Sequence, residues 1–348
     1  MISSRIRFFC IRTLCLFYIT MLLGSCGEEQ ASVLRGPDVP DDWPQEFTLA
    51  FFMGGDAAEV VERQDPVRGY LQEHLQIPVH LHLATNYSAV VEAVRSQRAD
   101  AMMVGPLAYV LAVEEANVEA LGIIVADNGE QSNYEADTDS VYFSAIVTRK
   151  GSGIETLEDL RGKNLAFVDP ASMSGHLAPR NHLIKNGIDP ETDLNAVFAG
   201  AHPTVLLSVN QGRVDAGATM LGNLYRLERE GMVDFCGFRE GQIATPEVIA
   251  ANYAECPEGG IALIALTDPI PGTPFAIRAD LPESFKAAVK QALLATKLDA
   301  ALQARMPRPS HYIDPSEEYG YAHLDEHYNS VRQLANLLDL DLQAIADQ

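Results

Sequence analysis

Two serines that follow a predicted buried strand are the residues of this chain best suited to bind an anion. Residues 167–176 read FVDPASMSGH: the strand ends at Pro170, Ser172 follows, and a helix is expected to begin at about Ser174. Serine is a favoured helix N-cap, and the first backbone N–H groups of a helix lack partners and lie at its positive end. Such a helix start stabilises an anion. Most serine-capped helices bind nothing, so an ordinary cap is an equally good interpretation of this segment alone.

Four other segments run from a predicted strand into a predicted helix start in the same way. In open α/β sheets ligands gather beyond the carboxyl ends of the strands, where such loops converge. Gly105 would let the backbone approach a ligand, and Pro106 suits the first turn of a helix. The four segments are 53–57, 84–88, 104–109 and 198–204.

These junctions belong to a chain in which short apolar runs alternate with amphipathic stretches from Gln45 onward, a pattern typical of a parallel α/β sheet. Residues 90–101 (VVEAVRSQRADA) are echoed at 205–216 (VLLSVNQGRVDA), with the Arg and the Asp-Ala pair in register. The echo predicts two α/β units of similar plan, one before and one after residue 140, with a ligand cleft between them. A chance likeness of two common helix-turn-strand units is the alternative. We predict strands at 47–53, 79–83, 101–104, 120–125, 141–147, 165–168, 196–199 and 261–266, and helices at 57–75, 88–97, 174–186, 204–211 and 281–293.

Composition narrows the class of protein. The chain has 348 residues with 48 acidic and 25 basic side chains, a formal charge of -23, and it lacks the basic footprint of a nucleic-acid-binding protein. With 47% hydrophobic and 21% charged residues it has globular composition. Its length favours two domains over one.

The first 25 residues have the features of an export signal. Three arginines precede an apolar run at 14–23, which is about half of the roughly 20 residues that a membrane-spanning helix needs. The run ends in LGSC at 23–26, which resembles the bacterial lipobox, so Cys26 is predicted to be a lipid anchor and residues 26–44 a tether. A cleaved secretory signal with a chance cysteine is the alternative. We therefore expect a membrane-anchored lipoprotein in the periplasm or at the cell surface.

Two cysteines remain in the folded part once the leader and the lipid anchor are set aside. Cys236 and Cys256 suit one disulfide in an oxidising compartment, and without a nearby His pair they are poor evidence for a zinc site. The sequence HLDEH at 323–327 fits the inverted zinc-protease pattern H-x-x-E-H. It has no obvious third ligand, so we predict a solvated helical face there. We expect neither a metal nor a cofactor.

The junction segments together give the chain a resemblance to a known family. From about residue 47 to residue 292 it resembles the periplasmic phosphate, phosphite and phosphonate-binding proteins of ABC transporters. The matching segments are 84–87 (ATNY), 105–109 (GPLAY), 142–144 (YFS), 152–154 (SGI), 157–163 (LEDLRGK), 167–175 (FVDPASMSG), 197–202 (VFAGAH) and 270–274 (IPGTP).

The resemblance implies an α/β fold of the type-II periplasmic binding-protein class. Two lobes, each a mostly parallel sheet flanked by helices, would be joined by two crossing strands. Residues 45–140 and 267–348 would form lobe 1, and residues 141–266 lobe 2. A protein of this kind is no enzyme: it closes on a small oxyanion and hands it to an ABC permease in the inner membrane. We expect a monomer that binds no nucleic acid.

The family's binding residues can be carried over position by position. Its Ser-Thr-Ser anion cradle falls on Ser172, Met173 and Ser174, beside Gly175. Met173 removes the middle hydroxyl of the cradle, which leaves the choice among phosphate, phosphite and simple phosphonates open. The cleft histidine falls on His202, and the ligand-facing tyrosines fall on Tyr87 and Tyr142, near Gly105.

The expected ligand has no cationic tail. Aminophosphonate binders of the family use acidic side chains for the ligand amine, one of them after the segment that matches 215–218. Here TMLGN follows at 219–223, and Thr273 stands where acidic or amide residues are often found. Two other functions stay open: a sensor of the same fold that presents a captured oxyanion, such as arsenite or phosphite, to a membrane histidine kinase, and, more remotely, a hydrolase that uses Ser174 or the two histidines of 323–327.

Overall fold

The computed structural model describes residues 35–126, 141–238, 242–307, 309–338, 340, 344 and 345. The predicted signal, the lipid-anchor residue Cys26 and the first part of the tether lie outside the described residues. In the described ranges, no helix combines the length and the apolar character that crossing a membrane requires.

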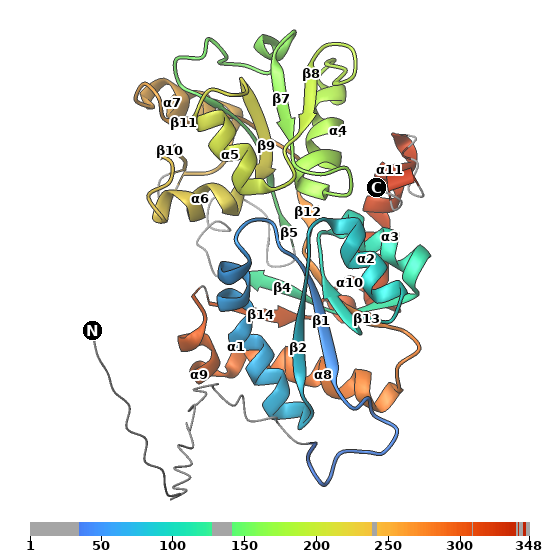
Figure 1. The fold of residues 1–348 in the computed structure, drawn as a ribbon. Helices are drawn as coiled ribbons and strands as arrows, with labels where there is room; N and C mark the ends of the chain where they lie inside the picture. The colour runs from blue at the N-terminus through green and yellow to red at the C-terminus, as the bar shows by residue number, and fades with distance from the viewer. Residues whose placement is uncertain are drawn as a thin grey trace, which may run out of the picture. The chain divides into compact units, whose positions relative to one another are not determined.

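Two six-stranded sheets form the framework of the described chain (Figure 1). The strand order is β14-β4-β13-β3-β1-β2 in the first sheet and β10-β11-β6-β9-β7-β8 in the second. The first sheet consists of β1 (Phe47–Phe52), β2 (Val79–Ala84), β3 (Ala101–Met103), β4 (Val118–Ala126), β13 (Pro274–Arg278) and β14 (Ser310–Ile313). The second consists of β6 (Ser144–Arg149), β7 (Asn164–Phe167), β8 (Asn195–Phe198), β9 (Ala216–Met220), β10 (Phe235–Cys236) and β11 (Ile261–Leu266).

Helices pack on both faces of each sheet, because successive residues of a strand point to opposite faces. In β1, Ala50 packs in one apolar cluster with α2 and α3, whereas Leu49 and Phe51 pack in another with α1 and α8. In β6, Val147 packs in the apolar cluster that includes α5, and Ile146 packs in the cluster that includes α4. We call the first sheet with its helices the first lobe: α1 (Ala57–Leu75), α2 (Tyr87–Arg95), α3 (Pro106–Ala116), α8 (Glu283–Ala295), α9 (Ala300–Arg305), α10 (Ser316–Tyr319) and α11 (Asn329–Leu337). The second sheet with α4 (Ala178–Lys185), α5 (His202–Asn210), α6 (Leu221–Arg229) and α7 (Pro246–Glu255) is the second lobe.

Both sheets are mixed, which refines the expected mostly parallel arrangement. The strands β2, β1 and β3 run parallel, as do β8, β7 and β9, and in these parts helices connect the strands. The strands β13 and β6 run antiparallel to their neighbours. Each is reached by a segment that has just crossed from the other sheet, so it enters in the opposite direction. The crossing segments β5 (Val141–Tyr142) and β12 (Ile270–Pro271) pair with each other. The fold class predicted from the sequence is confirmed.

The internal echo corresponds to equivalent structural units. The segment from α2 into β3 and the segment from α5 into β9 are both a helix, a turn and a strand. In the first, the Asp100 carboxylate accepts a hydrogen bond from the Thr48 N–H at 2.9 Å. In the second, the Asp215 carboxylate accepts from the Asn164 N–H at 2.8 Å. The repeated aspartate therefore anchors the start of the neighbouring strand in each sheet, which is a structural role.

A disulfide joins Cys236 at the end of β10 to Cys256 at the end of α7, with 5.5 Å between the two Cα atoms. It closes a loop of 20 residues and fixes α7 against the strands β10 and β11. The bond lies within the second lobe.

The H-x-x-E-H motif builds a helix end. His323 is the N-cap of the 3-10 helix Leu324–Tyr328, and the Glu326 carboxylate accepts hydrogen bonds from the backbone N–H groups of Ala322 and His323. These bonds are part of a capping box formed by His323 and Glu326. The prediction of a solvated face is wrong for His327, which is 9% exposed and packs among Tyr319, Tyr321 and Tyr328.

Candidate functional site

Four hydroxyl side chains from three distant parts of the sequence meet in the described structure. The Tyr87 hydroxyl lies close enough to Ser172, and the Tyr142 hydroxyl close enough to Ser174, for each serine to lower the pKa of its phenol. A Cβ atom built on Gly105 would lie 4.0 Å from the Tyr142 hydroxyl oxygen. We call Tyr87, Tyr142, Ser172 and Ser174 the hydroxyl cluster. The structure thus brings together residues that the sequence comparison selected one by one.

The hydroxyl cluster is withdrawn from solvent and carries no charge. Ser172, Ser174 and Tyr87 are 1%, 3% and 7% exposed. Burial, the largest cause, raises the pKa of both Tyr87 and Tyr142, and the nearby serines offset only part of this rise. Both phenols therefore keep their protons at neutral pH and can donate hydrogen bonds.

The serines are positioned by the start of a helix. Ser172 is the N-cap of the π-helical turn Met173–Leu177, which continues directly into α4. Its Oγ accepts a hydrogen bond from the Gly175 N–H at 3.0 Å. With this acceptor position used, the Ser172 hydroxyl hydrogen remains for a partner such as Tyr87.

Gly175 is required by close packing at this helix start. A Cβ atom there would lie 2.4 Å from the Cβ and from the Cγ2 of Val168, and 2.8 Å from the Ser172 Oγ. The Val168 N–H also donates to the Gly175 carbonyl at 2.9 Å, so the turn folds back onto the end of its own strand. No larger residue fits at this position without moving the serines.

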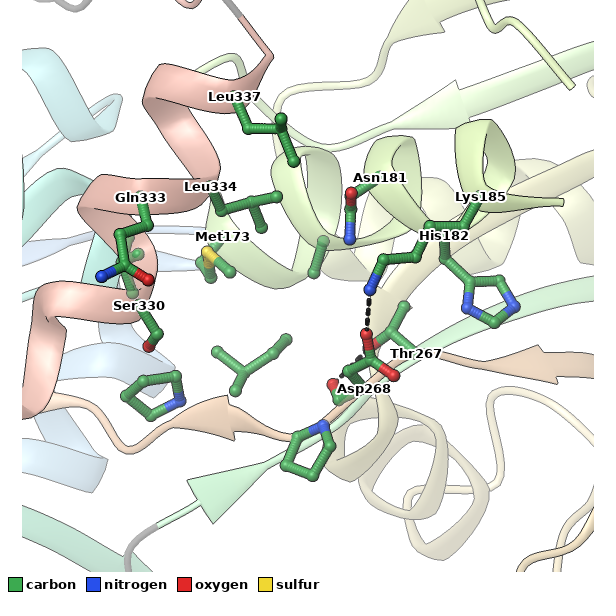
Figure 2. Close-up of a pocket in the computed structure, with 15 residues that line it drawn as sticks. Met173, Asn181, His182, Lys185, Thr267, Asp268, Ser330, Gln333, Leu334 and Leu337 are labelled. Carbon is green, nitrogen blue, oxygen red and sulfur yellow. Dashed lines mark hydrogen bonds and ion pairs between the residues drawn. The ribbon is translucent and has the colours of Figure 1, made fainter. Parts of the chain in front are cut away.

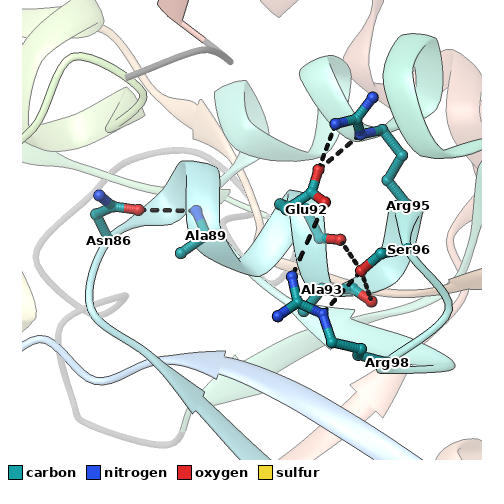
Figure 3. Close-up of polar contacts among 7 residues, drawn as sticks. All are labelled: Asn86, Ala89, Glu92, Ala93, Arg95, Ser96 and Arg98. Atoms are coloured by element: carbon teal, nitrogen blue, oxygen red, sulfur yellow. Dashed lines mark hydrogen bonds and ion pairs between the residues drawn. The ribbon is translucent and has the colours of Figure 1, made fainter.

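Tyr87 is the first residue of α2. The side-chain oxygen of Asn86 accepts a hydrogen bond from the Ala89 N–H at 2.7 Å, which caps the helix one residue before Tyr87 (Figure 3). At the far end of α2, the Ser96 hydroxyl donates to the Glu92 carbonyl at 2.6 Å, and the Glu92 carboxylate pairs with Arg95 at 2.6 Å. The Tyr87 ring lies 4.4 Å from the Phe52 ring at the end of β1.

Tyr142 is brought in by the crossing segment β5. Two residues further on, the buried Ser144 hydroxyl donates to the Ser174 carbonyl at 2.6 Å. This bond connects the crossing strand directly to the helix start. Sequence reasoning missed Ser144, although it stands in the YFS segment that carried the resemblance.

His202 is the first residue of α5, which follows the edge strand β8 of the second sheet. Its Nδ1 accepts a hydrogen bond from the Met220 N–H at 3.2 Å and lies 2.9 Å from the Thr219 hydroxyl. Met220 pairs with Ser144 in the second sheet. The His202 imidazole therefore lies next to Ser144, the residue that holds the Ser174 carbonyl. Because a backbone N–H can only donate, Nδ1 is the unprotonated nitrogen, and the neutral ring carries its proton on Nε2. Loss of solvation, with a smaller contribution from Arg226, lowers the pKa of His202 to about 4.

His202 lines a cavity of about 610 Å3. Phe52, which stacks on Tyr87, and Met220 line the same cavity, so it adjoins the hydroxyl cluster. Charged side chains from α1 and α6 enter it from the two lobes. The Arg226 guanidinium pairs with the Glu230 carboxylate at 3.1 Å on its own helix and with Glu59 of α1 at 3.7 Å.

The sequence analysis found no carboxylate for a ligand amine, but carboxylates do line the cavity beside the hydroxyl cluster. Asp56, Glu59, Glu62 and Glu230 all line the cavity, and Asp169, whose pKa is raised by burial, is close enough to act on Tyr87. The sequence comparison missed them because it looked for acids after β9, whereas α1 of the other lobe supplies most of them. Several already have partners: Glu59 and Glu230 pair with Arg226, and Asp56 caps α1.

The Met173 side chain lies away from this cavity. It lines a second cavity of about 300 Å3 between α4, the segment leading into β12, and α11 (Figure 2). Leu334 and Leu337 of α11 line the same space, and the Lys185 ammonium pairs with the Asp268 carboxylate at 2.7 Å across its edge. Any part of Met173 in binding a ligand at the hydroxyl cluster therefore falls to its backbone.

Comparisons with known proteins identify a family. The family model of the periplasmic phosphonate substrate-binding proteins of ABC transporters matches residues 49–318. The phosphate-import protein PhnD of Mycolicibacterium smegmatis is 29% identical over 255 residues, which are 67% of this chain and 76% of that protein. The solved structure of PhnD1 from Prochlorococcus marinus in complex with methylphosphonate has a TM-score of 0.64 at 18% identity, covering 85% of this chain and 99% of that one. A stretch of 96 residues, 27% of this chain, is 30% identical to the tetrathionate sensor histidine kinase TtrS of Salmonella typhimurium and covers 16% of that kinase.

The family match extends over both sheets and includes the whole hydroxyl cluster and His202. The solved structure shows the same fold over most of both chains. The chain belongs to the family of periplasmic phosphonate substrate-binding proteins of ABC transporters.

Proposed function

We propose that this protein captures a small phosphorus oxyanion, namely phosphate, phosphite or a simple phosphonate, at the hydroxyl cluster and delivers it to the permease of an ABC importer. The observation that supports this proposal is the meeting of Tyr87, Tyr142, Ser172 and Ser174 at the start of the helix that continues into α4. The relatives' names point to the same class of ligand: one is a phosphate-import protein and one was solved with methylphosphonate.

The chemistry of the cluster suits an oxyanion. Each hydroxyl can turn its hydrogen toward a bound oxygen, and the backbone N–H groups at the helix start point the same way. Hydrogen bonds from neutral donors to an ionised oxygen contribute about 1.5 to 3 kcal/mol each. Four or five of them hold an oxyanion firmly without a formal positive charge in direct contact.

His202 would complete the donor set from the second lobe. Its Nδ1 is occupied by the Met220 N–H, so the Nε2–H group is the one available to a ligand. Gly105 would present the start of α3, whose first residue is Pro106, from the first lobe. Since donors come from both lobes and from the crossing segment β5, an oxyanion would favour the arrangement in which the lobes are together.

The expected preference for a ligand without an ammonium group is supported by the partners that the cavity carboxylates already have. Three of the four carboxylates that line the cavity, Asp56, Glu59 and Glu230, are engaged by Arg226 or by the N-terminus of α1. An ammonium group would have to compete with these partners or remain unpaired, and a buried unpaired charge costs several kcal/mol.

Further features of the protein are part of the proposal. Cys26 would carry lipids and hold the protein at a membrane in the periplasm or on the cell surface, with residues 26–44 as the tether. The lobes would divide at 45–140 with 267–348, and at 141–266. The protein would act as a monomer and catalyse no reaction.

A thermal-shift and calorimetry screen of the purified protein tests the proposed function. We expect phosphate, phosphite or methylphosphonate to raise the melting temperature and to bind more tightly than aminoethylphosphonate, with sulfate as the control anion. Ser174→Ala and His202→Ala should each weaken the binding. Absence of binding by every phosphorus oxyanion, or unchanged affinity in both variants, would contradict the proposal.

Sensing is a second candidate function, because a stretch of this chain is similar to a sensor histidine kinase. In that case the protein would present its ligand-bound form to a membrane kinase. Deletion of the protein distinguishes the two: loss of phosphonate uptake supports import, whereas intact uptake with a changed transcriptional response supports sensing.

A further inference from the structure

The cavity beside the hydroxyl cluster is larger than a simple oxyanion needs. Its volume is about 610 Å3, and a water molecule takes about 30 Å3 in the liquid. The cavity thus has room for about 20 groups of that size, whereas phosphate or methylphosphonate has about five non-hydrogen atoms. A ligand with its phosphoryl group at the hydroxyl cluster could extend a tail past His202 and Phe52 into this space.

Three arginines line this cavity, and two of them, Arg226 and Arg63, come from opposite lobes. Arg226 of α6 lies near His202 and enters from the second lobe, and Arg63 of α1 enters from the first. They are close enough for Arg226 to lower the pKa of Arg63, although loss of solvation is the larger cause. An arginine keeps its proton even so, and two guanidinium groups that repel each other gain when an anion lies between them.

Arg63 has hydrogen-bonding capacity to spare. In the described ranges it makes no hydrogen bond and no ion pair within 4.0 Å, and its nearest opposite charges, Glu59 and Glu230, act on it only at longer range. Both of those carboxylates are within 4.0 Å of Arg226 instead. The guanidinium of Arg63 therefore has its donors available toward the cavity.

The other carboxylates of the cavity do not cancel this charge. The Asp56 carboxylate accepts hydrogen bonds from the Ala58 and Glu59 N–H groups at the start of α1. Glu62 also lines the cavity but is exposed, so solvent screens its charge. An uncharged tail would leave the guanidinium of Arg63 unpaired, and an ammonium tail would add to the positive charge between Arg63 and Arg226.

We propose that this cavity is a subsite for an anionic tail, so that the preferred ligand is a phosphonate that also carries a carboxylate, held between Arg63 and Arg226. The inference rests on the proposed function, because the phosphoryl end would occupy the hydroxyl cluster. Arg63 is then a specificity-determining residue: it contacts the tail and leaves the phosphoryl group to the serines and tyrosines.

Calorimetry with a matched set of ligands tests this inference. 3-Phosphonopropionate and propylphosphonate differ in whether the tail is charged, and methylphosphonate has no tail. We expect 3-phosphonopropionate to bind at least tenfold more tightly than propylphosphonate. In Arg63→Gln this preference should fall to less than threefold, with methylphosphonate affinity unchanged within twofold.

Arg68→Gln is the control variant, because Arg68 lies on the same helix and pairs with Asp65 without lining the cavity. It removes the same charge and should keep the tenfold preference. The inference is overturned if the two tailed phosphonates bind equally to the native protein, or if Arg63→Gln keeps the preference. Either result leaves the proposed function intact as long as methylphosphonate binds. If no phosphonate binds at all, the proposed function itself fails and the tail subsite fails with it.

Discussion

The hydroxyl cluster and the cavity beside it differ in how they are held in place. Tyr87, Ser172 and Ser174 are buried and Tyr142 is half-buried; all four are uncharged and are positioned by helix caps and a crossing strand. The cavity is lined by long charged side chains that pair at 3.1 to 3.7 Å and stay partly exposed. Ion pairs of this kind contribute little to stability and rearrange readily.

This difference suggests a division of labour between the two regions. Neutral donors that are already in place bind an oxyanion with little loss of side-chain freedom, which favours affinity for the phosphoryl group. Flexible charged side chains discriminate among tails, because a wrong charge leaves one of them unpaired. Substitutions in the cluster should therefore have large effects on every ligand, and substitutions in the cavity should have small effects that depend on the tail.

The largest effect is expected from Gly175→Ala in the cluster. The added Cβ would lie 2.4 Å from Val168, so the helix start must move and the serines with it. We expect phosphonate binding to weaken at least a hundredfold and the free energy of unfolding to fall by about 1 to 3 kcal/mol, as for an overpacked core.

Gly69→Ala is the matched control, because nothing lies within 4 Å of a Cβ at that position in α1. It should leave binding unchanged and raise the free energy of unfolding by about 0.5 to 1 kcal/mol, the difference in helix propensity. Calorimetry and urea unfolding provide both quantities. Native affinity in Gly175→Ala would show that the rigidity of this turn is unimportant.

Ser174→Ala should have the next largest effect. Loss of one charge-assisted hydrogen bond of about 1.5 to 3 kcal/mol corresponds to roughly tenfold to hundredfold weaker binding. Because the bond goes to the phosphoryl group, methylphosphonate and 3-phosphonopropionate should be affected alike. The control is Ser96→Ala at the far end of α2, whose hydroxyl bonds the Glu92 carbonyl, and it should bind normally. A loss confined to one of the two ligands would break the proposed division of labour.

The pH dependence of stability should reveal the state of His202. Its pKa is about 4 in the folded chain and about 6.5 in the unfolded chain. Above pH 6.5 both states are neutral and His202 contributes no pH dependence. As the pH falls below 6.5 the unfolded chain takes up the proton first, so the free energy of unfolding decreases. Between pH 7 and pH 5 the loss from this residue should be of the order of 1 to 2 kcal/mol.

Urea unfolding of native protein and His202→Gln at pH 7 and pH 5 measures this contribution. The variant should lose less stability over that interval than the native protein, whatever its stability at pH 7. His176 and His182 also have lowered pKa values and remain in both proteins, so they cancel in the comparison. Equal pH dependence in the two proteins would mean that His202 is protonated or solvated in the fold.

The smallest effect is expected from Glu59→Gln in the cavity. The Glu59 and Arg226 side chains are 59% and 18% exposed and 3.7 Å apart, so their pairing contributes about 0 to 1 kcal/mol. Methylphosphonate affinity should change by less than threefold. A tenfold change would show that the ion pair between the lobes, rather than the hydroxyl cluster, controls binding.

Much of the fold and the core of the site could be predicted from the sequence, because both depend on local patterns. Alternating apolar runs and helix starts located α1 and β11 at their observed ends, and the echoed aspartates indicated the two equivalent units. The strand-to-helix junction at 167–176 pointed to Ser172 and Ser174, whereas Tyr87 and Tyr142 were carried over from the resemblance to the family of binding proteins.

What depends on contacts between distant segments could not be predicted in this way. The pairing of Glu59 with Arg226 joins residues far apart in the sequence on two ordinary amphipathic helices, and nothing in either helix marks it. The strand β14 is not among the predicted strands, because its four residues carry no strand pattern of their own and form a strand by pairing with β4. The burial of His327 likewise comes from tyrosines that pack around it.

The most direct test of the central claim is a crystal structure of the purified protein with methylphosphonate. We predict that the phosphoryl oxygens lie within hydrogen-bond distance of the Ser174 hydroxyl and of at least one of the two tyrosine hydroxyls, with the methyl group directed toward the cavity that Arg63 and Arg226 line. A phosphoryl group bound in that cavity on the two arginines, with the hydroxyl cluster still closed on itself, would contradict the account.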